Sequence, residues 1–173
     1  KLTLEAYVTN EVTQTSSTKP LDIVLVLDQS GSMADDFNGN ETGKYSDTRQ
    51  YAMKQAVNSF IEKATSADGT HNMAIVTFGT DAKVLNSGWT KVDTEGAKAL
   101  TNAINGLSDK PTGATNVGAG MQKAQELMNS AKSDTNRQKV VIVFTDGVPT
   151  TTNEFDTDVA NSAITAAKSM KDA

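Results

Sequence analysis

Three side chains that carry oxygen atoms follow directly after a strongly apolar run of this sequence. The run covers residues 23–27, and Asp28, Ser30 and Ser32 alternate behind it. Carboxylate and hydroxyl oxygens are ligands that a small hard cation such as Mg²⁺ accepts. Because the three residues alternate, a loop that wraps around one point brings their oxygens together. An ordinary polar turn is the alternative, so this motif needs support from elsewhere in the chain.

Two later segments supply that support. Thr115 lies in a turn-rich stretch at 111–116, and Asp146 follows a second apolar run at 140–144. Uninterrupted apolar runs indicate strands that are buried on both faces of a parallel sheet. Ligand sites in such sheets lie beyond the carboxyl ends of the strands. The sequence therefore predicts that Asp28 and Asp146 reach the same sheet edge, where a loop presents Thr115.

This constellation resembles the metal-ion-dependent adhesion site (MIDAS) of von Willebrand factor type A domains, over roughly residues 20 to 172. The resemblance implies Mg²⁺ as the cofactor, with Mn²⁺ or Ca²⁺ as alternatives, and an open coordination position that an Asp or Glu of a partner fills. Two carboxylates balance the charge of a divalent cation, and Mg²⁺ usually keeps exchangeable waters. The implied ligands, some of them acting through water, are Asp28, Ser30, Ser32, Thr115 and Asp146.

Asp35 and Asp36 follow closely behind this motif. Their spacing is similar to that in the type A domains of integrin β subunits, where a second cation lies beside the first, so they are candidates for a second cation site. A solvated acidic turn in an acidic protein is the simpler interpretation, and we favour it.

Composition narrows the class of protein. The chain has 173 residues, which favours one domain, and a net charge of −5, which argues against a nucleic-acid partner. No apolar run approaches the length of a membrane span. The absence of cysteine excludes disulfides and thiolate metal sites, and it leaves the cellular compartment open.

Apolar periodicity predicts an α/β fold, a doubly wound and mostly parallel sheet with helices on both faces. A first helix should begin at a cap provided by Ser46 or Asp47. A short strand at 83–85 should be antiparallel at the sheet edge, as in the family. The other expected strands cover 23–27, 73–78 and 139–145, and the other helical stripes cover 97–107, 117–131 and 159–170.

The domain organisation divides at Pro20. Residues 1–19 read as an alternating strand and a linker, which we assign to an adjoining stalk region, and residues 20–173 read as the A domain. A complete A domain continues with further strands and a final helix, so the resemblance implies that this one is incomplete at its C-terminus. The strand at 139–145 would then have an open apolar edge, which soluble proteins avoid.

Within the family, residues 20–33 most resemble A domains of Gram-positive pilus-tip and surface adhesins. That likeness implies an extracellular virulence factor on the cell wall or pilus tip, which binds a collagen- or fibronectin-like host or matrix protein and is joined to the rest of an adhesin chain. It implies neither membrane insertion nor enzymatic activity. One alternative is an intracellular A domain that organises a chelatase or other AAA-type assembly. A Mg²⁺-dependent hydrolase is disfavoured, because no histidine accompanies the motif.

Overall fold

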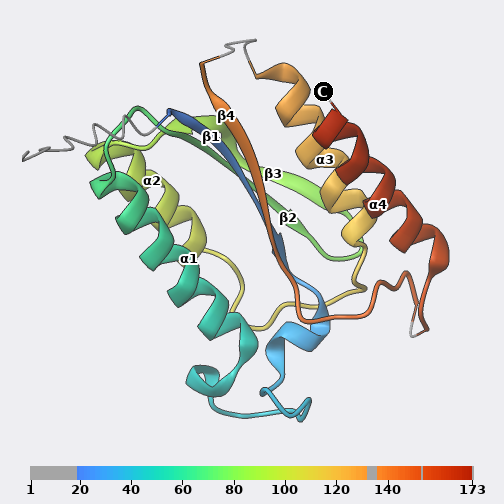
Figure 1. Ribbon diagram of the computed structural model, residues 1–173. Coiled ribbons are helices and arrows are strands. Elements are labelled where there is room, and N and C mark those ends of the chain that lie inside the picture. Colours follow the sequence, from blue (N-terminus) through green and yellow to red (C-terminus); the bar gives the residue numbers. More distant parts are fainter. Residues whose placement is uncertain (1–18, 132–135, 153, 173) are drawn as a thin grey trace, which may run out of the picture.

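Four strands form one sheet in the part of the chain that the computed structural model describes, residues 19–131, 136–152 and 154–172. Their order across the sheet is β3-β2-β1-β4 (Figure 1). The strands are β1 (Leu21–Asp28), β2 (Asn72–Phe78), β3 (Ala82–Lys91) and β4 (Gln138–Phe144). The helices are α1 (Arg49–Ser66), α2 (Thr94–Asn105), α3 (Val117–Ser130) and α4 (Thr157–Asp172), with short 3-10 turns η1 (Gly31–Ala34) and η2 (Tyr45–Asp47).

Strand β1 lies at the centre and is parallel to both of its neighbours. Asp28 is in register with Phe78 of β2, and Leu27 is in register with Phe144 of β4. The carboxyl ends of these three strands are therefore level, at the lower end of the sheet in Figure 1. The loops that leave them meet there, as a parallel sheet requires.

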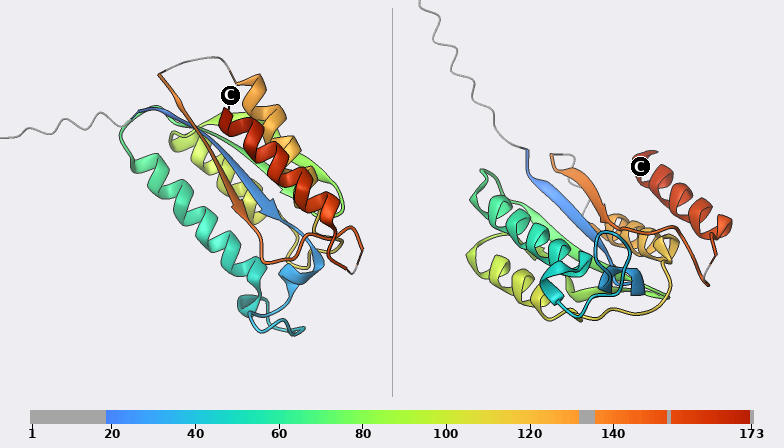
Figure 2. Two further views of the ribbon diagram at one scale, coloured as in Figure 1. Left: turned by 45° about the vertical axis from the view of Figure 1, so that its right-hand side comes forward. Right: turned by 90° about the horizontal axis from the view of Figure 1, so that it is seen from below.

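Helices cover both faces of the sheet, which explains why β1 is apolar without alternation. Ile23, Leu25 and Leu27 belong to one hydrophobic core with α1 and α2. Val24 and Val26 belong to a second core with α3 and α4. The two helix pairs lie on opposite sides of the sheet in both figures of the whole fold (Figures 1 and 2). The predicted doubly wound α/β fold is confirmed.

Two predictions about individual elements are corrected. The N-cap of α1 is Thr48, whose Oγ1 accepts a hydrogen bond from the backbone N–H of Tyr51 at 3.1 Å. Ser46 and Asp47 instead lie inside η2, because the backbone becomes extended only at Thr48. Strand β3 is antiparallel as expected, but it is much longer than 83–85 because residues 82–85 and 90–91 both pair with β2, on either side of an irregularity in the register.

The outer edge of β4 has no neighbouring strand within the described ranges. Its residues are half-buried or exposed, whereas β1 is almost fully buried. The predicted open edge is therefore present among these residues. Residues 1–18, which contain the predicted leading strand, lie outside the described part of the chain, so the division at Pro20 stays a prediction.

Candidate metal centre

The loop after β1 begins with a carboxylate whose two oxygens are both held. Asp28 is fully buried. Its Oδ1 accepts a hydrogen bond from the backbone N–H of Ser30 at 2.7 Å, and its Oδ2 accepts one from Oγ1 of Thr145 at 2.6 Å. Because Thr145 follows β4, this contact ties the ends of the neighbouring parallel strands β1 and β4 together.

A chain of side-chain contacts links the β1 loop to Asp146. Oγ of Ser30 lies 3.2 Å from Oγ of Ser32, and Oγ of Ser32 donates to Oδ1 of Asp146 at 3.0 Å. The last contact joins residues 114 positions apart in the sequence. The structure therefore places the hydroxyls of the first motif against the carboxylate that follows β4, as the sequence predicted.

Thr115 reaches the same place from the loop before α3. It is 6% exposed, and it lines a cavity of about 440 Å³ together with Ser32 and Asp146. A Cβ atom added to Gly147 would lie 3.2 Å from Oγ1 of Thr115, so the loop after β4 passes close to this hydroxyl. All five predicted site residues thus lie at one edge of the sheet.

A glycine contact fixes the Thr115 loop beside the β1 loop. The backbone N–H of Gly31 donates to the carbonyl of Gly113 at 3.0 Å. Gly113 has a φ of +107°, a conformation that favours glycine, and a Cβ there would lie 2.8 Å from Oγ1 of Thr80. A side chain at this position would collide with Thr80 in the turn between β2 and β3 and would displace the Thr115 loop.

Buried polar side chains support the loops from below. The fully buried Gln50 of α1 exchanges amide hydrogen bonds with Gln29 and donates to the carbonyl of Ser108 at 2.7 Å. Lys54, one helical turn further along, donates to the carbonyl of Leu107 at 2.6 Å and to Asp109 at 2.8 Å. These bonds attach the segment that leads to Thr115 to the same helix that supports the β1 loop.

Without a cation, the surroundings of Asp28 destabilise its charged form. Burial raises the pKa of Asp28, and the nearby charge of Asp146 adds to the rise, although hydrogen bonds from Ser30 and Thr145 oppose it. A buried carboxylate without a cation is held in its charged form at a cost. A divalent cation placed among these oxygens would remove that cost.

Two residues that the sequence reasoning missed complete the surroundings. Thr145 orients Asp28, and its position beside Asp146 is a signal that could have identified it. Arg49, the first residue of α1, forms an ion pair with Asp146 and donates to the carbonyl of Ser32 at 3.1 Å. No local sequence pattern indicates that Arg49 contacts Asp146, because the two residues are 97 positions apart.

Asp35 and Asp36 have other roles in the described structure. The carboxylate of Asp36 accepts hydrogen bonds from the backbone N–H groups of Asn38 and Asn40, at 2.8 and 2.9 Å, and the bond from Asn40 is the main cause of its lowered pKa. The backbone carbonyl of Asp35 accepts from the N–H of Arg49 at 3.0 Å. Asp36 therefore closes an acidic turn, and a second cation there stays a prediction.

The donor set fits a hard cation rather than a zinc-type ion. Within the described ranges, no group of three or more His, Cys, Asp or Glu residues is arranged to hold a metal. The candidate centre instead combines two carboxylates with three hydroxyls. Neutral and anionic oxygens in this combination suit Mg²⁺, Mn²⁺ or Ca²⁺. Asp28, Ser30, Ser32, Thr115 and Asp146 thus fit the group that the resemblance implies.

Solved structures with the same fold include bacterial pilus proteins. A von Willebrand factor type A structure from Catenulispora acidiphila is 23% identical with a TM-score of 0.65, over 86% of this chain and 31% of that chain. The PilB minor pilin from Streptococcus sanguinis is 25% identical with a TM-score of 0.62, over 76% and 30%. The pilus adhesin SpaC from Lactobacillus rhamnosus GG is 25% identical with a TM-score of 0.59, over 76% and 16%.

This chain therefore spans about a third or less of each of those proteins. No curated protein sequence matches it at a significant level. A family model for the von Willebrand factor type A domain matches residues 23–148, from within β1 to the loop that carries Asp146. The resemblance seen in the sequence is thus confirmed over most of the chain, and the protein belongs to the von Willebrand factor type A domain family.

Proposed function

We propose that this domain is the binding module of a cell-surface adhesin, and that it engages a protein partner through a divalent cation. Asp28, Ser30, Ser32, Thr115 and Asp146 would hold the cation, with Mg²⁺ as the first candidate. The observation that carries the proposal is the contact chain from Ser30 through Ser32 to Asp146, which gathers oxygens from the ends of two parallel strands.

When bound, the cation supplies a Lewis acid that attracts a carboxylate of the partner. The residues of the chain orient the ligands before any ion arrives. The backbone N–H of Ser30 and the hydroxyl of Thr145 fix the Asp28 carboxylate, and the hydroxyl of Ser32 fixes that of Asp146. Because these groups already point to one place, little side-chain freedom is lost when a cation binds.

The similar structures support a role in adhesion. Two of them are named as a minor pilin and a pilus adhesin, which favours an extracellular position on a cell wall or pilus tip for this chain as well. A collagen- or fibronectin-like matrix protein would be a suitable partner, and the rest of an adhesin chain would carry the domain. None of the helices in the described ranges has the length and apolar character that crossing a bilayer requires.

The alternative of a hydrolase finds no support at the site. His71, the single histidine of the sequence, lies at the opposite end of the sheet. It is buried, and its Nδ1 accepts a hydrogen bond from the backbone N–H of Leu21 at 3.1 Å. His71 is therefore too far from Asp146 to act as a general base at the candidate centre. A role in organising an AAA-type assembly has no specific observation in its favour.

The test combines cation binding with adhesion. Calorimetric titration with MgCl₂, MnCl₂ and CaCl₂ should show a single site in the parent, and Asp146→Asn should abolish it. Binding to immobilised collagen or fibronectin should need Mg²⁺ and disappear in chelator and in Asp146→Asn. Asp158→Asn removes an exposed carboxylate of α4 and is the matched control. Equal cation binding by parent and Asp146→Asn would overturn the proposal.

A further inference from the structure

Large apolar side chains are exposed on two loops at the sheet edge that carries the candidate centre. Phe37 is 72% exposed in the loop between η1 and η2, and Val148 and Phe155 are each 59% exposed in the loop between β4 and α4. Phenylalanine is among the residues most often buried, yet two of the five in this chain are exposed here. Both loops lie at the lower end of the sheet in Figure 1. We call these three side chains the apolar rim.

The turn that carries Phe37 is closed and lies against the ion pair of the centre. The carboxylate of Asp36 closes it by accepting hydrogen bonds from two backbone N–H groups of the turn. A Cβ atom added to Gly39 would lie 3.7 Å from a guanidinium nitrogen of Arg49. The same guanidinium is bound to Asp146. Phe37 is therefore presented on a preorganised turn beside the candidate centre.

The loop that carries Val148 and Phe155 is fastened to the centre itself. Val148 lines the cavity of the centre. The backbone N–H of Thr150 donates to the carbonyl of Thr115 at 3.1 Å, and its Oγ1 accepts from the backbone N–H of Thr115 at 3.2 Å. The backbone N–H of the residue after Phe155 donates to the carbonyl of Pro149 at 2.8 Å. This bond folds the loop back on itself, so that Phe155 is held near Val148.

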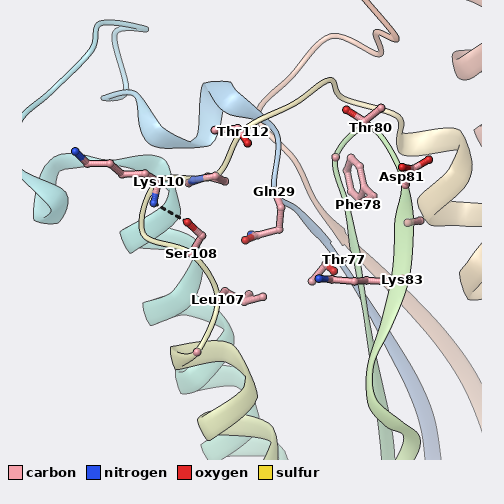
Figure 3. Close-up of a pocket in the computed structure, with 14 residues that line it drawn as sticks. Gln29, Thr77, Phe78, Thr80, Asp81, Lys83, Leu107, Ser108, Lys110 and Thr112 are labelled. Carbon is pink, nitrogen blue, oxygen red and sulfur yellow. Dashed lines mark hydrogen bonds between the residues drawn. The ribbon is translucent and has the colours of Figure 1, made fainter.

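A hollow of about 460 Å³ at the same edge has no comparable preference for one class of ligand. It lies between the end of β2 and the segment that connects α2 to α3 (Figure 3). Asp81 and Lys83 both line it, so its charges favour neither an anion nor a cation. The apolar rim is therefore the more informative surface beside the centre.

We propose that the apolar rim contacts large apolar side chains that flank the acidic residue of the partner polypeptide. This inference rests on the proposed adhesive function and names the chemistry of its partner. Val148 shares the cavity of the centre with Asp146, so a carboxylate bound there brings its neighbouring residues to the rim. Burial of apolar area then favours binding, and the closed loops lose little freedom. Exposed apolar side chains that gather at one place are typical of protein interaction sites.

The test compares capped peptides whose acidic residue has different neighbours. Amide NMR spectra of the ¹⁵N-labelled protein in MgCl₂ are recorded during titration with acetyl-Gly-Leu-Asp-Leu-Gly-amide and with acetyl-Gly-Ser-Asp-Ser-Gly-amide. Peptide concentrations up to about 10 mM cover the weak affinities of short peptides. The Leu-flanked peptide with Asn in place of Asp is the ligand control. Phe37→Ser and Phe155→Ser are the test variants, and Ile164→Ser removes an equally exposed apolar side chain from α4 as the matched control.

The Leu-flanked Asp peptide should bind about fivefold or more tightly than the Ser-flanked one, and it should shift the amides of the apolar rim. Phe37→Ser and Phe155→Ser should each reduce this ratio by about half or more. Their affinities for the Ser-flanked peptide and for Mg²⁺ should equal those of the parent, because neither side chain holds the cation. Ile164→Ser should bind both peptides as the parent does. All three replaced side chains are exposed, so thermal unfolding of the variants should match the parent.

Two results would overturn the inference and leave the metal-dependent adhesion standing. One is equal affinity for the Leu-flanked and the Ser-flanked Asp peptides. The other is an equal loss in Phe37→Ser, Phe155→Ser and Ile164→Ser, since the gain would then not depend on the apolar rim.

Other results would assign the surface differently. If neither Asp peptide binds although calorimetry shows a Mg²⁺ site, the inference and the adhesive function both fail. If the Asn peptide binds as tightly as its Asp counterpart, the apolar rim acts without the centre and the inference is wrong. A dimer in sedimentation velocity that Phe37→Ser abolishes would assign the apolar rim to a second copy of the chain.

Discussion

Strand β1 carries a buried aspartate near each end, and the two aspartates differ in whether a positively charged side chain binds them. Asp22 accepts hydrogen bonds from the guanidinium of Arg137 at 2.7 and 2.8 Å and from the amide of Asn72 at 2.8 Å. Among the residues that the structure describes, Asp28 receives its hydrogen bonds from Ser30 and Thr145. One carboxylate has its counter-charge within the fold, and the other has none bonded to it. The difference separates a structural carboxylate from one arranged for an ion that comes from outside.

The arginines at the two ends of the sheet differ in whether they bind the aspartate of β1. At the amino end of the sheet, Arg137 also donates to the carbonyl of Leu21 at 2.8 Å, so it fastens the start of β4 to the start of β1. At the carboxyl end, Arg49 is bound to Asp146 and not to Asp28. Removing Arg137 should therefore lower the stability of the fold, whereas removing a carboxylate at the carboxyl end should weaken cation binding.

The largest effect is expected from Arg137→Met. Breaking a buried ion pair leaves Asp22 charged and uncompensated, which should lower the free energy of unfolding by about 3–5 kcal/mol. Urea unfolding measures this loss, with Lys139→Met, an exposed lysine two residues further along the chain, as the control. Adding Asp22→Asn to Arg137→Met should restore part of the loss. A stability equal to that of Lys139→Met would contradict the structural role assigned to the ion pair between Asp22 and Arg137.

Asp28→Asn should act in the opposite sense. Its affinity for Mg²⁺ should fall at least about tenfold, or ~1.4 kcal/mol, because one of two carboxylate ligands is lost. Its metal-free stability should be equal to or above that of the parent, since a buried and uncompensated charge is removed. Calorimetry and thermal unfolding in chelator measure the two quantities. If metal-free stability fell as much as in Arg137→Met, Asp28 would be a structural residue like Asp22.

Thr115→Val tests a neutral ligand of the same centre. The affinity for Mg²⁺ should fall by about 0.5–1.5 kcal/mol, the size of one ordinary hydrogen-bond contribution, because water can take the place of a hydroxyl. Calorimetric titration beside Asp28→Asn gives the ranking of the two ligands. A loss larger than that of the carboxylate would contradict the role assigned to Thr115.

Arg49→Gln should raise the affinity for Mg²⁺. The guanidinium bound to Asp146 competes with an arriving cation, and a partly exposed ion pair of this kind is worth about 0.2–1 kcal/mol. Lys44→Gln removes the same charge from an exposed pair with Asp47 and is the control in the calorimetric titration. Weaker Mg²⁺ binding by Arg49→Gln than by Lys44→Gln would show that the arginine supports the site instead of competing with the ion.

The pH dependence of metal-free stability gives the subtlest test. Because the pKa of Asp28 is raised above 3.8 in the folded state, the folded chain holds that proton more tightly than the unfolded chain. The contribution of Asp28 to stability should therefore fall as pH rises from 3.8 through the folded pKa. Asp28→Asn should remove this decline in urea unfolding. Asp36, whose pKa is lowered, should contribute with the opposite sign, so Asp36→Asn should lose stability above pH 3.8.

Several parts of the fold and the site could be predicted because their signals are local. The apolar runs predicted the strands β1 and β4, and Asp28 and Asp146 lie at or just beyond the ends of those runs. Strand β1 is buried as expected, whereas the residues of β4 are half-buried or exposed, so the prediction of burial on both faces is wrong for β4. The cap of α1 could not be placed, since Ser46, Asp47 and Thr48 are all good caps and only the backbone path distinguishes them. Cation binding itself stays a prediction that the titrations decide.

The sequence by itself determined the strands, the order of the elements and the oxygen-bearing side chains at the strand ends, because each depends on residues that are neighbours in the chain. Only the tertiary structure decided that Arg49 binds Asp146 and that Arg137 binds Asp22. The two ion pairs join residues about a hundred positions apart. The physical reason is that charge pairing depends on distance in space, which packing sets and local sequence does not encode.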